Sequence, residues 1–327
     1  MKTRAGFCSR CGLTAAIGLL LSLTGVQESL AQSGPVSIVV ATSAGTGVDV
    51  IGRVMGEQLS KQLDTAFVIE NRAGASGNIG AEYVANAAPN GRTLLVGATT
   101  FGTNPAVNTQ LRYHPVKDFT PISLMGTGII SLAVTPNLPV NSVQELIALA
   151  KSKPGSINYA SPGNGTPQHL AMELLKLETG ADLFHVPYKT TGGALTDLAG
   201  GHVSAMLVPV DSALPLASAG KLKILAVMSA ERFSGLPDVP TFTEAGYPKL
   251  QVDVWYGLFA PAGTPSELIA KLNQNVDQAL KQPSVIETLK KQAIEPVGGP
   301  PERMAELLRS ELDRWPAVVK AAHISAD

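Results

Sequence analysis

The sequence predicts an α/β protein of two lobes, each with a mostly parallel sheet flanked by helices. Short runs rich in β-branched residues alternate with amphipathic helical stretches, the pattern of parallel strands joined by helices. Polar, glycine-containing loops stand between strand and helix in several of these units. The length of 327 residues agrees, because chains of this size tend to divide into two domains.

The first expected lobe is discontinuous and covers residues 32–125 and 246–327. Strands are expected at 36–40, 67–70 and 93–97, with helices at 48–63 and 79–86 between them. The chain returns with a strand at 255–260, followed by helices ending near 280, at 284–292 and at 302–319. A helix start at 264–267 is indicated by Pro265, because proline suits the first helical position.

The second expected lobe is inserted at residues 126–245. Its strands are expected at 129–134, 157–160, 183–186, 205–208 and 224–228. Ser142 and Glu145 form a capping box that starts a helix running to residue 151, and another helix is expected at 168–178. No internal repeat or heptad pattern interrupts this organisation.

The first 31 residues have the pattern of a cleaved secretory leader. Lys2, Arg4 and Arg10 precede an uncharged apolar run at 13–25, and Ser29 and Ala31 place small residues at a cleavage site. A membrane anchor is the alternative, but this run is shorter than the roughly 20 residues that span a bilayer. A leader predicts export, and the absence of any later spanning segment predicts a soluble periplasmic protein.

Composition excludes several classes of function. The two cysteines, Cys8 and Cys11, lie within the leader, so the mature chain is expected to have neither disulfides nor thiol chemistry. The formal net charge is −1, and lysine and arginine are scattered without a basic stripe, so nucleic acid is not expected as a partner.

Catalytic and metal-binding patterns are largely missing from the sequence. It has no HExxH, GxxxxGK[ST] or GxSxG motif. His169 and Glu173 stand four residues apart on an expected helix, but a zinc site normally needs three or four protein ligands, so we interpret them as a packing or surface pair. No metal and no cofactor are expected.

Strand-end loops rich in glycine, serine and threonine are the strongest candidates for a binding site. A helix that begins after such a loop presents unpaired amide groups and the positive end of its dipole, which together bind anions. Ordinary turn chemistry is the alternative, because such loops are common in α/β folds. The candidate loops lie at 44–47, 73–76, 99–100 and 163–166.

Several segments resemble one known family in order along the chain. The segment ENRAGASGNIGA at 70–81 is similar to the family's ENRPGAGGNIGA, and NGRTLL at 90–95 is similar to its DGYTLL. Further matches are NP at 104–105, NYASPGNGT at 158–166 with HLA at 169–171, HVPYK at 185–189 and LPDVPT at 236–241. By these motifs the chain resembles the solute receptors of tripartite tricarboxylate transporters, also called Bug receptors.

This resemblance implies a fold and a function. The fold would be the type II periplasmic binding-protein fold, with a hinge of crossing strands between the lobes. The protein would be a monomeric receptor without enzymatic activity, which captures a small carboxylate and delivers it to membrane permease subunits. A sensor that signals to a membrane kinase is an alternative with the same fold. An exported hydrolase using Ser76 or Ser161 with His169 is a second alternative, but no carboxylate is evident to orient that histidine.

The resemblance also places the ligand between the lobes. Main-chain amides of the first two loops and a threonine after the third strand would hold its carboxylate from the first lobe. The residues implied there are Ala44, Gly45, Thr46, Asp49, Ala75, Ser76, Thr99 and Thr100.

The second lobe would close on the ligand with another set of residues. Lys189 would add a charge-assisted hydrogen bond, although a solvated loop lysine is an equal interpretation. His169 would lie in the first helical turn and either contact the ligand or cap the helix. The residues implied are Ser161, Gly165, Thr166, His169, Tyr188 and Lys189.

Three segments depart from the family pattern. Residues 41–49 read ATSAGTGVD where members typically carry PFPPGGxxD, so this loop should be more flexible and richer in hydroxyls. Thr190 replaces a glycine, and Leu207-Val208-Pro209 stands where many members have FDN. Asp211 nearby would then recognise an amine or hydroxyl on the ligand, or else lie in a surface loop.

Overall fold

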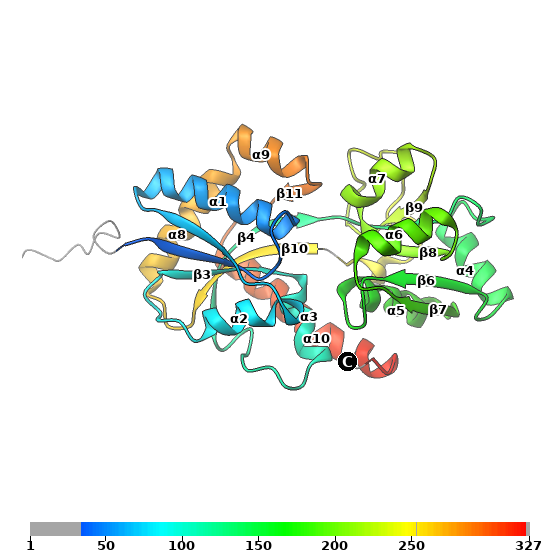
Figure 1. The fold of residues 1–327 in the computed structure, drawn as a ribbon, viewed down its shortest axis with the longest axis horizontal. Coiled ribbons are helices and arrows are strands. Elements are labelled where there is room, and N and C mark those ends of the chain that lie inside the picture. The colour runs from blue at the N-terminus through cyan, green and yellow to red at the C-terminus, as the bar shows by residue number, and fades with distance from the viewer. Residues whose placement is uncertain (1–33, 253, 325–327) are drawn as a thin grey trace, which may run out of the picture.

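The computed structural model describes residues 34–252 and 254–324. The expected leader lies outside these residues. The chain forms two α/β lobes, each built on its own sheet, with strands passing between them (Figure 1).

The first lobe is built on a six-stranded sheet of order β11-β4-β10-β3-β1-β2. Strands β1 to β4 run in one direction, because β1 pairs in parallel with β2 and β3, whereas β10 is antiparallel to both β3 and β4. β11 is antiparallel to β4. The strands are β1 (Val36–Val40), β2 (Phe67–Asn71), β3 (Thr93–Ala98), β4 (Phe119–Gly128), β10 (Val254–Pro261) and β11 (Ile294–Pro296).

Alternation along the strands buries both faces of this sheet. Ile38 and Val40 point into one core cluster with helices α1 and α8, whereas Val39 points into a second cluster with α2 and α10. Such near-continuous apolar strands are typical of sheets covered on both faces. The helices of this lobe are α1 (Gly47–Leu63), α2 (Asn78–Ala85), α3 (Thr99–Val107), α8 (Ser266–Leu280), α9 (Pro283–Lys290) and α10 (Pro301–Ala321), with a 3₁₀ turn, η2, at Ala75–Gly77.

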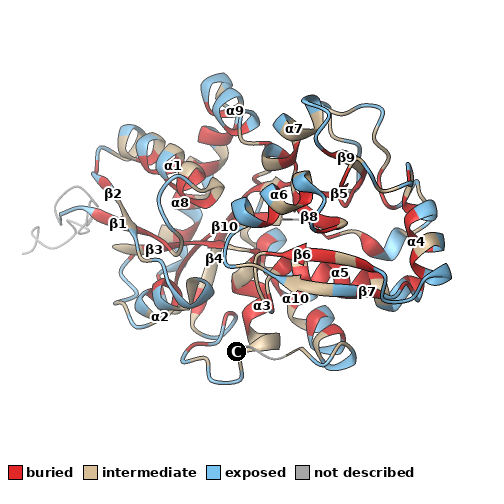
Figure 2. Ribbon diagram, turned by 45° about the vertical axis from the view of Figure 1, so that its right-hand side comes forward, coloured by how far each residue is buried: buried red, intermediate tan, exposed pale blue. Residues whose placement is uncertain are grey.

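The second lobe is built on a five-stranded sheet of order β7-β6-β8-β5-β9. β6 pairs in parallel with β7 and β8, whereas β5 is antiparallel to β8 and β9. Its strands are β5 (Ile130–Val134), β6 (Ile157–Ser161), β7 (Leu183–Pro187), β8 (Ala205–Pro209) and β9 (Lys223–Val227). Its helices are α4 (Val143–Ser152), α5 (Pro167–Thr179), α6 (Thr191–Gly200) and α7 (Val210–Ser218), with a 3₁₀ turn, η3, at Pro248–Leu250. Figure 2 shows buried strands between helices whose outer faces are exposed.

Two strands and one helix connect the lobes. β4 ends at Gly128 and the chain enters β5 at Ile130, while β10, beginning at Val254, returns beside β4. Helix α10 starts in the first lobe, where Met304 packs in the α2 and α10 cluster, and ends with Trp315 buried in the core of the second lobe. The lobes therefore share a helix as well as a pair of crossing strands.

The structure adds elements that the sequence pattern did not indicate. These are α3, β4, α6, α7 and β11. Helix α3 reads TTFGTNPAV and α6 reads TGGALTDLAG, both rich in weak helix formers, so periodicity gives little signal there. Packing supplies the missing stability, since Phe101 of α3 stacks against Tyr113 and contacts Phe119 edge-on.

Within the part of the chain that the structure describes, no helix combines the length and the apolar character needed to cross a membrane.

Candidate functional site

The candidate loops gather at one edge of each sheet. In the first lobe Val40 pairs with Asn71 and with Val96, so β1, β2 and β3 end together, and helices α1, α2 and α3 begin there. In the second lobe Ser161 pairs with Pro187, and β6 runs parallel to β8, so α5, α6 and α7 begin at a common edge. Helix starts at the carboxyl ends of parallel strands are where ligands bind in open α/β sheets.

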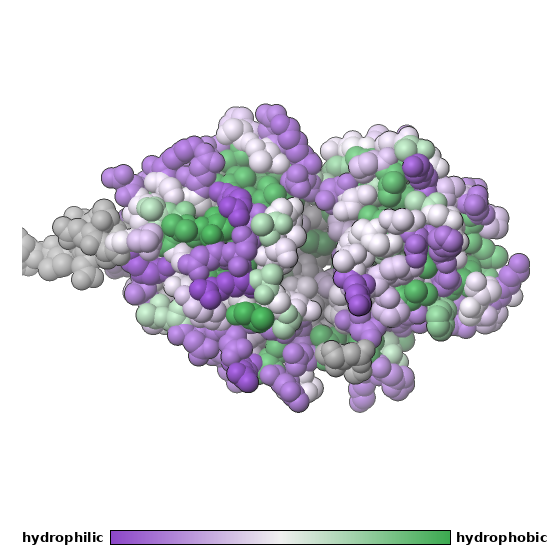
Figure 3. All heavy atoms as spheres, viewed as in Figure 1, coloured by the Kyte–Doolittle hydropathy of each residue, from purple (hydrophilic) through white to green (hydrophobic). Residues whose placement is uncertain are grey.

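These two edges approach each other beside the crossing strands. Val107, at the end of α3, contacts the Gly165 loop of the second lobe, with its side-chain carbons 3.2–3.3 Å from where a β-carbon on Gly165 would stand. The molecular surface is hollowed between the lobes in Figure 3. We take this interlobe region as the candidate site.

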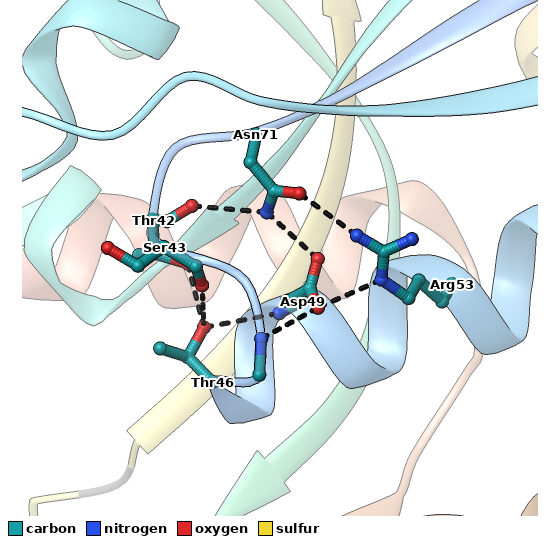
Figure 4. A network of polar contacts seen from close by, with 7 residues as sticks. Thr42, Ser43, Thr46, Asp49, Arg53 and Asn71 are labelled. Carbon is teal, nitrogen blue, oxygen red and sulfur yellow. Dashed lines mark hydrogen bonds and ion pairs between the residues drawn. The ribbon is translucent and has the colours of Figure 1, made fainter.

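A buried carboxylate organises the first loop. Asp49 is 2% exposed and accepts hydrogen bonds from Gly45 N at 2.9 Å, Arg53 Nε at 2.9 Å and Asn71 Nδ2 at 2.8 Å (Figure 4). The Arg53 hydrogen bond, aided by those from Gly45 and Asn71, lowers the pKa of Asp49 to about 2. Its oxygens are thus engaged within the first lobe, so Asp49 shapes the loop that carries Ala44 and Gly45.

Helix α1 begins under this loop. Thr46 is its N-cap, accepting a hydrogen bond from Asp49 N at 3.4 Å and contacting the Thr42 hydroxyl at 2.8 Å. Ala44 and Gly45 are exposed. The cap orients the first turn of α1 so that its unpaired amides lie at the sheet edge, next to those exposed loop residues.

The second loop is conformationally strained. Four consecutive residues, 74–77, have positive φ, including the non-glycine residues Ala75 (φ 46°) and Ser76 (φ 56°). Asn104 Nδ2 holds this shape by donating to Ser76 O at 3.0 Å. The Ser76 side chain is exposed. Strain of this kind is held by the surroundings and tends to occur at ligand clamps and active sites.

Thr99 and Thr100 lie in the first turn of α3 rather than in a loop. Thr99 is 3% exposed, and its Oγ1 accepts a hydrogen bond from Trp255 N at 3.1 Å. Thr100 is half-buried, with Oγ1 3.7 Å from where a β-carbon on Gly77 would stand. Thr99 therefore ties α3 to β10, while Thr100 faces the second loop.

In the second lobe Ser161 and His185 form a direct contact. Ser161 has no exposed surface, and its Oγ lies 2.6 Å from His185 Nε2. His169 Nδ1 accepts a hydrogen bond from Gly165 N at 3.0 Å, and Thr166 caps α5. The rings of His169 and His185 are stacked with their centroids 3.9 Å apart. The two histidines therefore hold the 161–166 loop from beneath.

Burial keeps both histidines neutral at ordinary pH. Desolvation lowers the pKa of His169 to about 4, with a smaller contribution from the charge of Lys176. Desolvation also lowers the pKa of His185 to about 4, and the neighbouring His169 adds to that shift. Below them Tyr159 donates to Glu173 Oε1 at 2.5 Å, so the expected packing role of Glu173 takes the form of a buried hydrogen bond.

In the loop after β7, some side chains form hydrogen bonds within the second lobe and one charged side chain is left exposed. The Tyr188 hydroxyl donates to Asp197 Oδ2 at 2.6 Å, and burial and this carboxylate raise the pKa of Tyr188 to about 12. Thr190 caps α6 by accepting from Gly193 N at 3.2 Å. Lys189 is exposed and forms no hydrogen bond or ion pair with the residues described.

Asp211 lies in the first turn of α7, close to the crossing strands. Val210 N donates to Ile129 O at 2.9 Å, which fixes the start of α7 beside the β4 to β5 connection. The Asp211 side chain is exposed, yet the surrounding protein raises its pKa through desolvation. Tyr256 of β10 lies near enough for the charge of Asp211 to contribute to raising the pKa of that phenol, after desolvation. No sequence pattern marks Tyr256 as a site residue.

The described residues do not pair Ser161 with His169 as the hydrolase alternative requires. Ser161 contacts His185 rather than His169, is sealed from solvent, and no described carboxylate forms a hydrogen bond with either ring. Residues 34–252 and 254–324 contain no group of three side chains arranged to hold a metal ion.

A separate cavity of about 570 Å³ lies elsewhere in the first lobe. It is lined by nine residues between Pro105 and Lys117 and by Arg309, Leu312 and Asp313 of α10. None of the candidate loops contributes to it, so its size alone does not make it the candidate site.

The fold and the facing strand-end loops define the class of two-lobed periplasmic binding proteins. A family model for the tripartite tricarboxylate transporter family receptor matches residues 51–324. The chain therefore belongs to this receptor family, as its motifs indicated. It is 32% identical to protein BugT of Bordetella pertussis over 314 residues, which cover 94% of this chain and 96% of BugT.

Solved structures of similar proteins agree with this family assignment. An R. palustris protein with adipate has a TM-score of 0.78 at 36% identity, covering 90% of this chain and 98% of that one. MatC from Rhodopseudomonas palustris with bound malate has a TM-score of 0.75 at 35% identity, covering 88% and 99%. The periplasmic binding protein BugD has a TM-score of 0.75 at 31% identity, covering 90% and 99%.

Proposed function

We propose that the protein is a periplasmic receptor that binds a small carboxylate between its two lobes and delivers it to a membrane transporter of the tripartite tricarboxylate type. Export would use the N-terminal leader, cleaved after Ala31. The protein would act as a monomer, without catalysis.

One observation carries this proposal: six helices begin at two sheet edges that approach each other beside the crossing strands. Each helix start presents unpaired amides and a partial positive charge. Opposed sets of such groups suit an anion held between lobes, and two similar proteins were solved with adipate and with bound malate. A carboxylate is the ligand class that fits both observations.

The residues expected at the site fall into two groups, those that would contact the ligand and those that would hold the binding loops in place. Ala44, Gly45, Ala75, Ser76 and Thr100 would contribute loop amides and hydroxyls from the first lobe. Asp49, Thr99, Ser161, His169 and Tyr188 would act by holding those loops, because their polar atoms are engaged inside their own lobes. Lys189, Gly165 and Thr166 would close from the second lobe.

A thermal-shift screen of the purified protein tests this function. The ligands are mono-, di- and tricarboxylates, with neutral amides and sugars as controls. At one hundred times the dissociation constant, a ligand stabilises the folded state by about 2.7 kcal/mol, which raises the melting temperature by several degrees. A selective rise with one group of acids is expected. A panel in which no acid raises the melting temperature would overturn the proposal.

A charge substitution locates the site. Ala44→Asp places a carboxylate on the exposed first loop, where the start of α1 tolerates negative charge but a bound carboxylate is repelled. The affinity for the acid found in the screen should fall at least about tenfold. Ala44→Asn has the same shape without the charge and should bind nearly as well as the wild type. Equal affinity in both variants would place the ligand elsewhere.

A further inference from the structure

Tyr256 occupies a central position between the lobes. It pairs with Ala98 of β3, the residue before Thr99, and with Gly126 of β4. Its hydroxyl oxygen lies 3.0 Å from where a β-carbon on Gly47 would stand and 3.2 Å from the same point on Gly128. The phenol therefore extends beneath the first residue of α1 and beside the strand that crosses to the second lobe.

The hydroxyl of Tyr256 lacks a hydrogen-bond partner among residues 34–252 and 254–324. The side chain is more than nine-tenths buried, with 9% of the residue exposed, yet it forms no hydrogen bond with any residue the structure describes. It is not among the unpaired side-chain atoms sealed from solvent, so the hydroxyl keeps some contact with the space outside the chain. Leaving such a group unpaired is unfavourable, which points to a partner that arrives from outside the chain.

A carboxylate from the opposite lobe accompanies this hydroxyl. Asp211 follows Val210, whose amide is bonded to Ile129 O, while Gly128, the neighbour of Ile129, borders the Tyr256 phenol. The Asp211 side chain is exposed, and its carboxylate is held by the backbone amides of Ser212 and of Asp211 itself, without a side-chain partner among the described residues. The first lobe thus offers the Tyr256 hydroxyl and the start of α1, and the second lobe offers the Asp211 carboxylate as an acceptor.

We infer that Tyr256 and Asp211 form a specificity subsite that recognises a hydrogen-bond donor, a hydroxyl or an ammonium group, on the carboxylate ligand. This inference rests on the proposed function. The helix starts of the first lobe would take the carboxylate, and the donor would lie between the phenol oxygen and the Asp211 oxygens. A second carboxylate at this position would be repelled by Asp211, so plain dicarboxylates fit less well.

Matched acids that differ at one carbon test the subsite. Binding to the wild type would be measured by isothermal titration calorimetry with three sets, each of a plain acid, its 2-hydroxy form and its 2-amino form. The sets are succinate, malate and aspartate; glutarate, 2-hydroxyglutarate and glutamate; and propionate, lactate and alanine. Within the set that binds, the hydroxy or amino acid should bind at least about tenfold more tightly than its plain counterpart, because a hydrogen bond to a charged group is lost without the donor.

Two variants assign the effect to the two residues. Tyr256→Phe and Asp211→Asn should each reduce the preference for the donor-bearing acid at least about threefold. Tyr256→Phe should change the affinity for the plain acid little, and Asp211→Asn should leave it unchanged or, for a dicarboxylate, raise it. Tyr256→Phe should leave the melting temperature of the free protein unchanged, because the lost hydroxyl has no hydrogen-bond partner among the described residues. Matched controls are Tyr247→Phe in the second lobe and the exposed Asp182→Asn at the opposite end of β7, which should retain the preference.

Each outcome decides between the two proposals. If an acid binds and the donor-bearing form has no advantage, the subsite is wrong while the receptor function stands. If Tyr256→Phe and Asp211→Asn weaken plain and donor-bearing acids equally, the residues act on lobe closure and not on specificity, and the subsite is wrong again. If no acid in any set binds the wild type, the proposed function fails and the subsite fails with it.

Discussion

The two lobes hold comparable glycine-containing loops in opposite ways. In the first lobe, residues 74–77 place alanine and serine at positive φ, and the Asp49 carboxylate anchors the neighbouring loop with charge-assisted bonds. In the second lobe, Gly163 (φ 136°) and Gly165 (φ 69°) take the positive φ angles, and two stacked neutral histidines support the loop. The first-lobe loops thus combine backbone strain with a buried charged anchor, whereas the second-lobe loop uses glycines at its positive φ angles and is supported by uncharged rings. The two lobes should therefore respond differently to acid and to substitution.

Acid should loosen the second lobe first, and this is the largest expected effect. An unfolded histidine has an ordinary pKa of 6.5, whereas those of His169 and His185 are lowered to about 4. Below pH 6.5 the unfolded chain therefore binds protons that the folded chain does not, so stability falls as the pH drops from 6.5 to 4. The loss should be on the order of 2–4 kcal/mol for the coupled pair. Glu173 and Lys176 face these rings and modify the effect.

Melting temperatures at pH 7, 5.5 and 4 check this expectation. His185→Phe keeps the stacking but removes one titrating ring, so it should reduce the dependence on pH by about half. The exposed His202→Phe is the matched control and should leave the dependence unchanged. An unaltered pH dependence in His185→Phe would show that other groups are responsible.

The charged anchor of the first lobe should have the next largest effect. Asp49→Ala removes the acceptor for Gly45, Arg53 and Asn71, and should lower the free energy of unfolding by about 2 kcal/mol. The lowered pKa of Asp49 means that acid removes this contribution only as the pH falls from 3.8 to about 2, below the range of the histidines.

Urea unfolding measures the effect of Asp49→Ala. Glu57→Ala is the matched control on the exposed face of α1, where the pair with Lys61 is solvated, and should change stability by less than about 0.5 kcal/mol. Equal midpoints in the two variants would contradict the role of Asp49 as an anchor.

Exchanging the loop residues should give the smallest effects, with opposite signs. Ser76→Gly relieves a residue at φ 56° and should raise the free energy of unfolding by about 0.5 kcal/mol. Gly165→Ala forces a β-carbon to φ 69° and brings it 3.2 Å from Val107, and should lower it by about 1 kcal/mol. Chemical denaturation of both variants checks the signs. A destabilising Ser76→Gly would mean that this loop is not strained.

The sequence predicted the two-lobed architecture and most elements, because long apolar periodicity and capping signals such as Ser142 are local. It did not indicate α3, since its residues form a helix only when Phe101 packs among other aromatic rings. The proposed division at residues 126 and 245 stays a prediction.

The candidate site was only partly accessible from sequence. Loop composition selected the segments that meet at the two edges, since the carboxyl ends of parallel strands lie together. Tyr256 was missed because it belongs to a strand that pairs with Ala98 across a long sequence separation. No local pattern marks its hydroxyl, which lacks a partner among the described residues. The engagement of Asp49 and Ser161 inside their lobes also depends on partners, Asn71 and His185, that only the fold brings near.

Helix α10 has a consequence for how the protein folds. Trp315 and Val318 are buried in the core of the second lobe, while the preceding member of that core in sequence is Val252. During synthesis the segment that forms the second sheet therefore emerges without the large side chain that completes its interior. It should stay unable to reach its full stability until α10 is available. The two lobes are thus expected to mature together, late, and as one cooperative unit.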